Sequence, residues 1–245
     1  MNPTDLSNAL LYGIPVVLYA SMYQSFDSML GCLGGAHIER SPAPGELPPS
    51  PSESDDAGLH ISVARSPEQM AAARDLVRKR YAWRGYDVLD TDAESQREIT
   101  FLVSSTTAVL GTLTLGLDGP HGLRAEGAYR DVVERFRAAG HRVCELTRLA
   151  LADRADTKTV LASLFSLAHA VGRTSHDVSH VFIEVNPRHV SFYSRVLGFI
   201  VEATGKVCER VHAPSTLLQV EIETLEQRLG LVHIAGLMQP LAEAA

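Results

Sequence analysis

The sequence predicts one mixed α/β domain, a sheet with helices packed on its faces. Strand-length apolar runs and amphipathic helical stretches follow one another in the order β-α-β-β-α-β-α-β-α-β-β. The chain has 245 residues, of which 45% are hydrophobic and 21% are charged. This composition is that of a globular protein, and the length allows a sizeable core.

The first half of the domain begins with an alternating strand, "LHISVA". A helix follows over residues 66–83, because Ser66 suits the N-cap, Pro67 the first helical position and Gln69 a capping box. "ITFLVSS" and "AVLGTLTLGLD" then predict two antiparallel strands joined by a short polar turn. "GAYRDVVERFRAAG" predicts a helix that ends at Gly140.

The second half contains the strands expected at the centre of the sheet. "HRVCELTRLAL" is long and largely apolar, as buried strands are. "KTVLASLFSLAHAVGRT" predicts a helix, and "HVFIEV" predicts another central strand. Asn186 as N-cap and Pro187 as first helical residue then start a further helix. "IVEATGKV" and "STLLQVEIE" supply the last two strands.

Segments outside this domain differ in composition. Residues 39–58 are rich in Pro, Ser and acids and predict a disordered linker between an N-terminal appendage (1–38) and the domain (59–222). The appendage is interpreted as helical or flexible, with peripheral membrane contact left open. It lacks a basic n-region, which argues against a signal peptide. Residues 223–245 form a C-terminal tail for which a helix is one interpretation.

Charge and cysteine content limit the partners and the compartment. The formal net charge is −7, and residues 1–58 carry −6 of it (seven acids, one arginine), which leaves −1 for residues 59–245. A nearly neutral domain gives no electrostatic footprint for general nucleic-acid binding. The three cysteines are widely spaced and odd in number. They favour a reducing compartment, and we expect a cytoplasmic protein.

Tyr193 has two interpretations from the residues alone. Val190, Tyr193, Val196 and Leu197 share one face of the helix that Asn186 starts, and this face is apolar. The tyrosine could therefore simply pack in the core. A buried hydroxyl still needs a partner, so it could instead point into a slot between strands.

Several motifs together resemble a known family. "NPRHVSFYSRVLGF" resembles the closing motif of GNAT-type acyltransferases. "GTLTLGLDGPHGL", "AGHRVCELTRLAL", "FIEVNPRHVSFYSRVLGF" and "VHAPSTLLQVEI" are similar to the long-chain N-acyl amino acid synthases, relatives of the homoserine-lactone autoinducer synthases. The resemblance spans roughly residues 60–222. It implies a GNAT-like mixed, mostly antiparallel central sheet with helices on both faces.

The resemblance implies an enzyme that moves a long-chain fatty acyl group from an acyl carrier protein thioester to the amino group of an amino acid. It makes Tyr193 the acid that protonates the thiolate and Glu145 the residue that binds or deprotonates the ammonium. Arg148 and Thr147 would bind the amino acid. Strict alternation puts Glu145 and Arg148 on opposite faces, so a β-bulge is needed if both serve the cleft. The pantetheine arm would be bound by Leu149, Ala150, Leu151 and Asn186.

One departure from the family's pattern bears on the donor. CoA-using members have a Gly-rich turn that holds the pyrophosphate through backbone N–H groups. Here the loop is "ADRADTKT", with no glycine and two aspartates, so the 4′-phosphopantetheine of a carrier protein is favoured over acyl-CoA. We expect neither a bound cofactor nor a metal. Thr157 could contact the phosphate of the arm or cap the next helix.

An acidic carrier protein would need a basic surface. Arg74, Arg78, Lys79 and Arg84 lie on or just beyond the first helix and are candidates for it, although a solvated helix face explains them equally. Two alternatives stay open. One is a CoA-dependent N-acyltransferase acting on a small amine, and the other is a non-catalytic acyl-binding or carrier-docking module.

Overall fold

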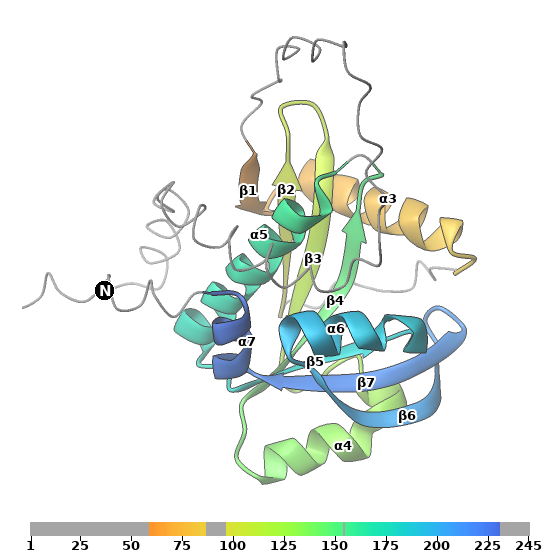
Figure 1. Ribbon diagram of the computed structural model, residues 1–245, viewed down its shortest axis with the longest axis vertical. Coiled ribbons are helices and arrows are strands. Elements are labelled where there is room, and N and C mark those ends of the chain that lie inside the picture. The colour runs from red at the N-terminus through yellow and green to blue at the C-terminus, as the bar shows by residue number, and fades with distance from the viewer. Residues whose placement is uncertain (1–58, 87–96, 154, 231–245) are drawn as a thin grey trace, which may run out of the picture.

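The structure is a computed structural model that describes residues 59–86, 97–153 and 155–230. The predicted appendage (1–38) and linker (39–58) lie outside the described residues. Within these ranges the chain forms a seven-stranded sheet with helices on both faces (Figure 1). None of the helices in the described ranges has the length and apolar character that a membrane crossing requires.

The elements follow the predicted order. They are β1 (His60–Val63), α3 (Pro67–Trp83), β2 (Glu98–Ser104), β3 (Val109–Leu117), α4 (Glu126–Ala138), β4 (Val143–Leu151), α5 (Thr157–Ala170), β5 (His180–Val185), α6 (Val190–Leu197), β6 (Ile200–Cys208), β7 (Ala213–Glu221) and α7 (Ile222–Arg228). The strands lie in the order β1-β2-β3-β4-β5-β7-β6. Only the β4–β5 pair is parallel among these neighbours, which confirms the predicted mostly antiparallel sheet.

The helix ends can be compared with the boundaries that local sequence signals predict. Ser66 and Gln69 form the predicted capping box at the start of α3. Asn186 accepts a hydrogen bond from the backbone N–H of Arg188, as expected of an N-cap, but a 3₁₀ turn over Pro187–His189 precedes α6. At the C-terminal end, Leu225 of α7 is buried in the core, so the folded unit extends past the boundary expected at residue 222.

Two layers of side chains cover the sheet. Helices α5, α6 and α7 pack over one face in a core that includes Leu115, Phe165 and Leu218. On the other face lie α3 and α4, and Tyr129 of α4 is buried with Phe182 and Leu217 (Figure 1). The first layer is tightly packed: a Cβ atom at Gly111 of β3 would lie 2.3 Å from Cγ1 of Val160. Glycine at this position therefore lets α5 approach the sheet closely.

The parallel pair β4–β5 separates soon after it forms. Residues 143–145 pair with residues 180–182, after which β4 continues beside β3 and β5 continues beside β7. A bulge in β4 accompanies the separation, because three steps from Thr147 to Ala150 oppose two steps on β3. Arg148 lies in this bulge with a left-handed φ of 52°. The sheet thus opens at its centre while every strand keeps one paired edge.

Candidate active site

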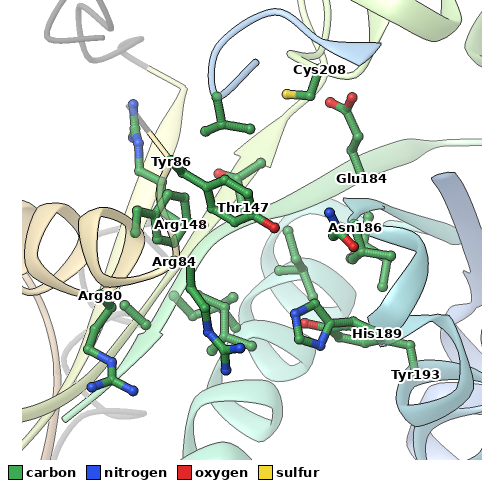
Figure 2. Close-up of a pocket in the computed structure, with 18 of the residues that line it drawn as sticks. Arg80, Arg84, Tyr86, Thr147, Arg148, Glu184, Asn186, His189, Tyr193 and Cys208 are labelled. Carbon is green, nitrogen blue, oxygen red and sulfur yellow. The ribbon is translucent and has the colours of Figure 1, made fainter. Parts of the chain in front are cut away.

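A cavity of about 460 Å³ lies where β4 and β5 separate (Figure 2). Seven of the residues expected at the site line it, namely Thr147, Arg148, Leu149, Ala150, Leu151, Asn186 and Tyr193. Arg84, one of the expected docking residues, lines it as well. Apolar side chains such as Leu161 and Phe165 of α5 form the inner wall. The cavity therefore joins polar groups near its opening to an apolar interior.

Tyr193 reaches the cavity from α6. Its ring makes edge-on contacts with Phe192 and Phe199, with centroid separations of 5.2 and 5.9 Å. Burial raises the pKa of Tyr193, and the nearby Tyr81 hydroxyl raises it further. Burial also raises the pKa of Tyr81 to about 12. Both phenols are therefore neutral near pH 7 and can donate a proton.

Arg148 is held in place by an acidic partner on β2 of the same sheet. Its Nη1 donates to Oε2 of Glu98 at 2.8 Å, and Arg124 Nε donates to the other oxygen of the same carboxylate at 2.5 Å. Burial opposes ionisation of Glu98, but the hydrogen bond from Arg124 and the charge of Arg148 outweigh it and lower the pKa of the Glu98 carboxyl. The result is a buried, charged cluster that fixes the Arg148 side chain at the wall of the cavity.

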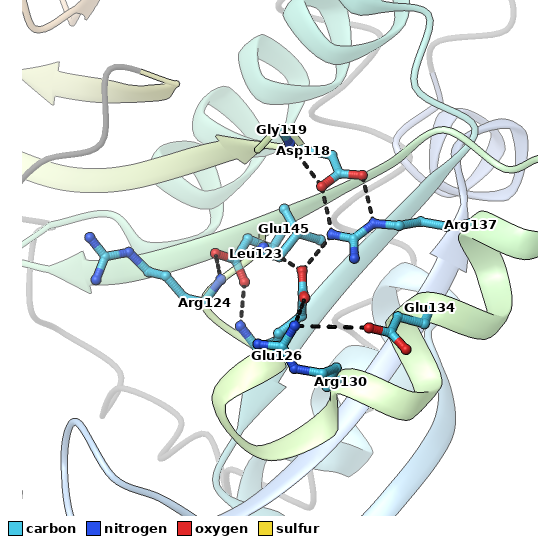
Figure 3. Close-up of polar contacts among 10 residues, drawn as sticks. Asp118, Gly119, Leu123, Arg124, Glu126, Arg130, Glu134, Arg137 and Glu145 are labelled. Carbon is cyan, nitrogen blue, oxygen red and sulfur yellow. Dashed lines mark hydrogen bonds and ion pairs between the residues drawn. The ribbon is translucent and has the colours of Figure 1, made fainter. Parts of the chain in front are cut away.

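Glu145 does not line the cavity. Its two carboxylate oxygens accept backbone N–H groups of Arg124 and Ala125 at 2.7 and 2.9 Å (Figure 3). Burial raises the pKa of Glu145, and these two hydrogen bonds oppose the rise. The expected bulge is present, but it brings only Arg148 to the cleft. Glu145 lies before the bulge, in the part of β4 that pairs with β5. Its side chain accepts hydrogen bonds from the backbone at the start of α4 and does not line the cavity.

Three of the four expected docking residues lie outside the cavity. Arg74, Arg78 and Lys79 are exposed on α3, and Arg78 pairs with Asp75 of the same helix at 2.9 Å. Arg84 is exposed at the C-terminal end of α3 and stacks on Trp83. These four side chains therefore present positive charge along the helix that leads to the cavity opening.

The loop before α5 shows that Thr157 does not cap this helix. Asp156, and not Thr157, caps α5: its carboxylate accepts the backbone N–H of Lys158 and the hydroxyl of Thr159. Thr157 instead lines the cavity. Asp153 of the same loop pairs with Arg80 of α3. The positive end of the helix dipole is thus already next to a carboxylate.

Glu184 is a cavity residue that the sequence analysis missed. It lies on β5, and its side chain is 6% exposed. Arg210 Nη2 donates to its Oε2 at 2.8 Å, while Arg210 Nη1 donates to the carbonyl oxygen of Arg124 at 2.7 Å. A signal was available, since "HVFIEV" places a carboxylate in an otherwise apolar strand, just as "VCEL" does for Glu145.

Comparison with known proteins identifies a matching family and similar solved structures. The family model described as "N-acyl amino acid synthase FeeM" matches residues 72–221. The solved structure of FeeM, an N-acyl amino acid synthase from uncultured soil microbes, is 25% identical, with a TM-score of 0.63 over 72% of this chain and 98% of that chain. No curated protein matches this chain.

Two other solved structures are similar at lower scores. An acyl-CoA N-acyltransferase from Pseudomonas aeruginosa is 14% identical, with a TM-score of 0.49 over 66% of this chain and 99% of that chain. The AHL synthase LasI is 14% identical, with a TM-score of 0.48 over 71% of this chain and 95% of that chain.

Proposed function

The chain belongs to the N-acyl amino acid synthase FeeM family and is an acyltransferase, and from this premise we propose that it acts in the cytoplasm on a long-chain acyl carrier protein thioester. The acceptor is the amino group of an amino acid, and the product is an N-acyl amino acid. The observation that carries the proposal is the cavity at the β4–β5 separation, which gathers Tyr193, Arg148 and the backbone of Leu149–Leu151.

The cavity supports a direct transfer. Past the bulge, no strand of the described residues pairs with the edge of β4 that faces β5, so the amides of a pantetheine arm can pair with this edge as a strand would. The thioester carbonyl then lies beside Tyr193, and the acyl chain extends along Leu161 and Phe165. Arg148 offers its guanidinium to the carboxylate of the amino acid. Tyr193 donates its proton to the thiolate as the C–S bond breaks.

The start of α5 supports a carrier protein as donor. A CoA pyrophosphate would need backbone N–H groups at this helix start, but the Asp156 carboxylate occupies that position and would repel it. The single phosphate of a carrier-bound arm has no such requirement. CoA-dependent transfer to a small amine is the second candidate function, and it is favoured only by Arg80 and Arg84 at the opening, which could bind phosphates.

The donor is tested by supplying the full-length protein with acyl carrier protein thioesters and, separately, with acyl-CoA of the same chain length. Each donor is combined with the proteinogenic amino acids, and N-acyl products are measured by mass spectrometry. We expect product with the carrier protein and a much lower rate with CoA. Product with acyl-CoA alone would exclude the carrier protein, and tight acyl binding without any product would favour the non-catalytic module.

The basic residues of α3 give a separate test of docking. We expect that the double change Arg78→Glu and Lys79→Glu raises KM for the acyl carrier protein about tenfold, because the charge reversal repels an acidic partner and slows association. The kcat with a short pantetheine thioester, which lacks the protein, should stay unchanged. Arg65→Glu at the other end of α3 is the matched control. An unchanged KM for the carrier would assign these side chains to a solvated helix face.

A further inference from the structure

Thr147 of β4 and Glu184 of β5 lie on opposite sides of the gap between these two strands. Glu145 pairs with Phe182 in the parallel register, so two residues further along each strand lead to Thr147 and Glu184. Residues two apart on a strand point to the same face, which here is the face covered by α4, since Phe182 packs against that helix. Both residues line the cavity (Figure 2).

Each of these two side chains has a buried oxygen without a donor. Oε1 of Glu184 and the hydroxyl of Thr147 have no hydrogen-bond partner among the described residues. Arg210 holds only the other oxygen, Oε2, of Glu184. The Cys208 thiol nearby is a weak donor and is neutral, because burial and the charge of Glu184 raise its pKa more than Arg210 lowers it. Buried acceptors that lack donors are costly, so a ligand that brings several N–H donors fits them.

Tyr193 approaches the same gap from the opposite face of the sheet. It packs with the core of α5, α6 and α7, to which Leu146 and Ile183 belong, the neighbours of Thr147 and Glu184 in sequence. A thioester lying in the gap would therefore have a carboxylate on one face and a phenol on the other. This arrangement suits a reaction in which the nucleophile arrives from one face and the leaving group is protonated from the other.

We propose that Glu184, assisted by Thr147, binds the ammonium group of the acceptor and takes its proton. This inference rests on the proposed acyltransfer to an amine and names the residues that select a primary amine. Glu184 is then the base that the resemblance had assigned to Glu145. Arg210 positions the Glu184 carboxylate and leaves Oε1 for the substrate.

The protons balance across the gap. The first ammonium proton passes to Glu184 and from there to solvent, and the nitrogen lone pair forms the C–N bond. As the C–S bond breaks, the thiolate takes the proton of the Tyr193 hydroxyl. The second nitrogen proton leaves as the amide forms and restores Tyr193 through solvent. One thioester and one ammonium thus give one amide, one thiol and one proton.

The test is the kinetics of Glu184→Gln on the full-length protein. We expect kcat/KM for the amine to fall by about 100-fold or more, the scale of general base catalysis, with the binding constant for the acyl donor unchanged. The remaining rate should increase with pH as the amine loses its proton in solution, whereas the wild-type rate should depend less on pH. Thr147→Val should raise KM for the amine about tenfold through loss of one hydrogen bond.

Controls separate catalysis from stability. Glu202→Gln removes a carboxylate of the same sheet that pairs with Arg135 at 2.6 Å outside the cavity, and it should leave kcat/KM unchanged. Thermal unfolding of each variant reports any loss of folding. Wild-type rates in Glu184→Gln would overturn the amine site. If the wild type acylates simple amines but no amino acid, the proposed acceptor is wrong and the same variants still test Glu184. Failure of the wild type with every amine would overturn both.

Discussion

Replacement of Tyr193 by Phe lowers kcat by about 100- to 1000-fold, the range that general acid catalysis contributes. The change removes one hydroxyl and keeps the ring, whose edge-on contacts with Phe192 and Phe199 hold α6 in place. Because burial raises the pKa of Tyr193, its proton is present throughout the neutral range. Steady-state rates with a saturating thioester measure the effect, and the acyl-donor binding constant should change little.

The acidity of the thiol leaving group tests whether Tyr193 acts as an acid or only packs in the core. A thioester of a more acidic thiol leaves with less need for a proton, so Tyr193→Phe should lose less activity with an aryl thioester than with an alkyl thioester. Tyr129→Phe is the matched control, since the Tyr129 hydroxyl donates to the carbonyl of Ser215 at 2.8 Å and faces the other core. Equal losses of activity with both thioesters would show that Tyr193 has a structural role and does not act as the acid.

Local sequence signals predicted the elements because those signals act over a few residues. The capping box of Ser66 and Gln69, and the Asn186–Pro187 pair, each define a helix start without help from the rest of the chain. The alternation of "LHISVA" and the apolar run of "HVFIEV" are equally local. The elements of the described domain and their order therefore follow from patterns along the chain, whereas the mostly antiparallel sheet was implied by the family resemblance.

The roles of the two strand carboxylates could not be predicted in this way. Glu145 in "VCEL" and Glu184 in "FIEV" have the same local environment, an acid among apolar neighbours. They differ in where strand pairing stops, since Glu145 lies within the β4–β5 pair and Glu184 lies beyond it. That boundary depends on the bulge in β4 and on the loop that ends at Ala125, both of which involve distant parts of the chain.

The position of Glu145 leads to a prediction about stability. Glu145→Ala should lower the free energy of unfolding by about 2–5 kcal/mol, because the backbone N–H groups of Arg124 and Ala125 would stay buried without an acceptor. The carboxylate also lies over Gly116, where an added Cβ would come within 3.0 Å of its Cγ. Urea denaturation at neutral pH measures the loss. Glu134→Gln on α4, a solvent-exposed control, should change stability by less than about 0.5 kcal/mol.

The same variant decides whether Glu145 also acts in the reaction. The cluster that begins at Arg124 includes Glu98 and reaches Arg148 at the cavity, so a displaced loop would weaken amino acid binding. We therefore expect Glu145→Ala to raise KM for the amino acid more than it lowers kcat. If Glu145 were the catalytic base, Glu145→Ala would show the reverse: a large fall in kcat with native stability. That outcome would make Glu145 a catalytic residue although it does not line the cavity, and the Glu184 assignment would then have to be abandoned.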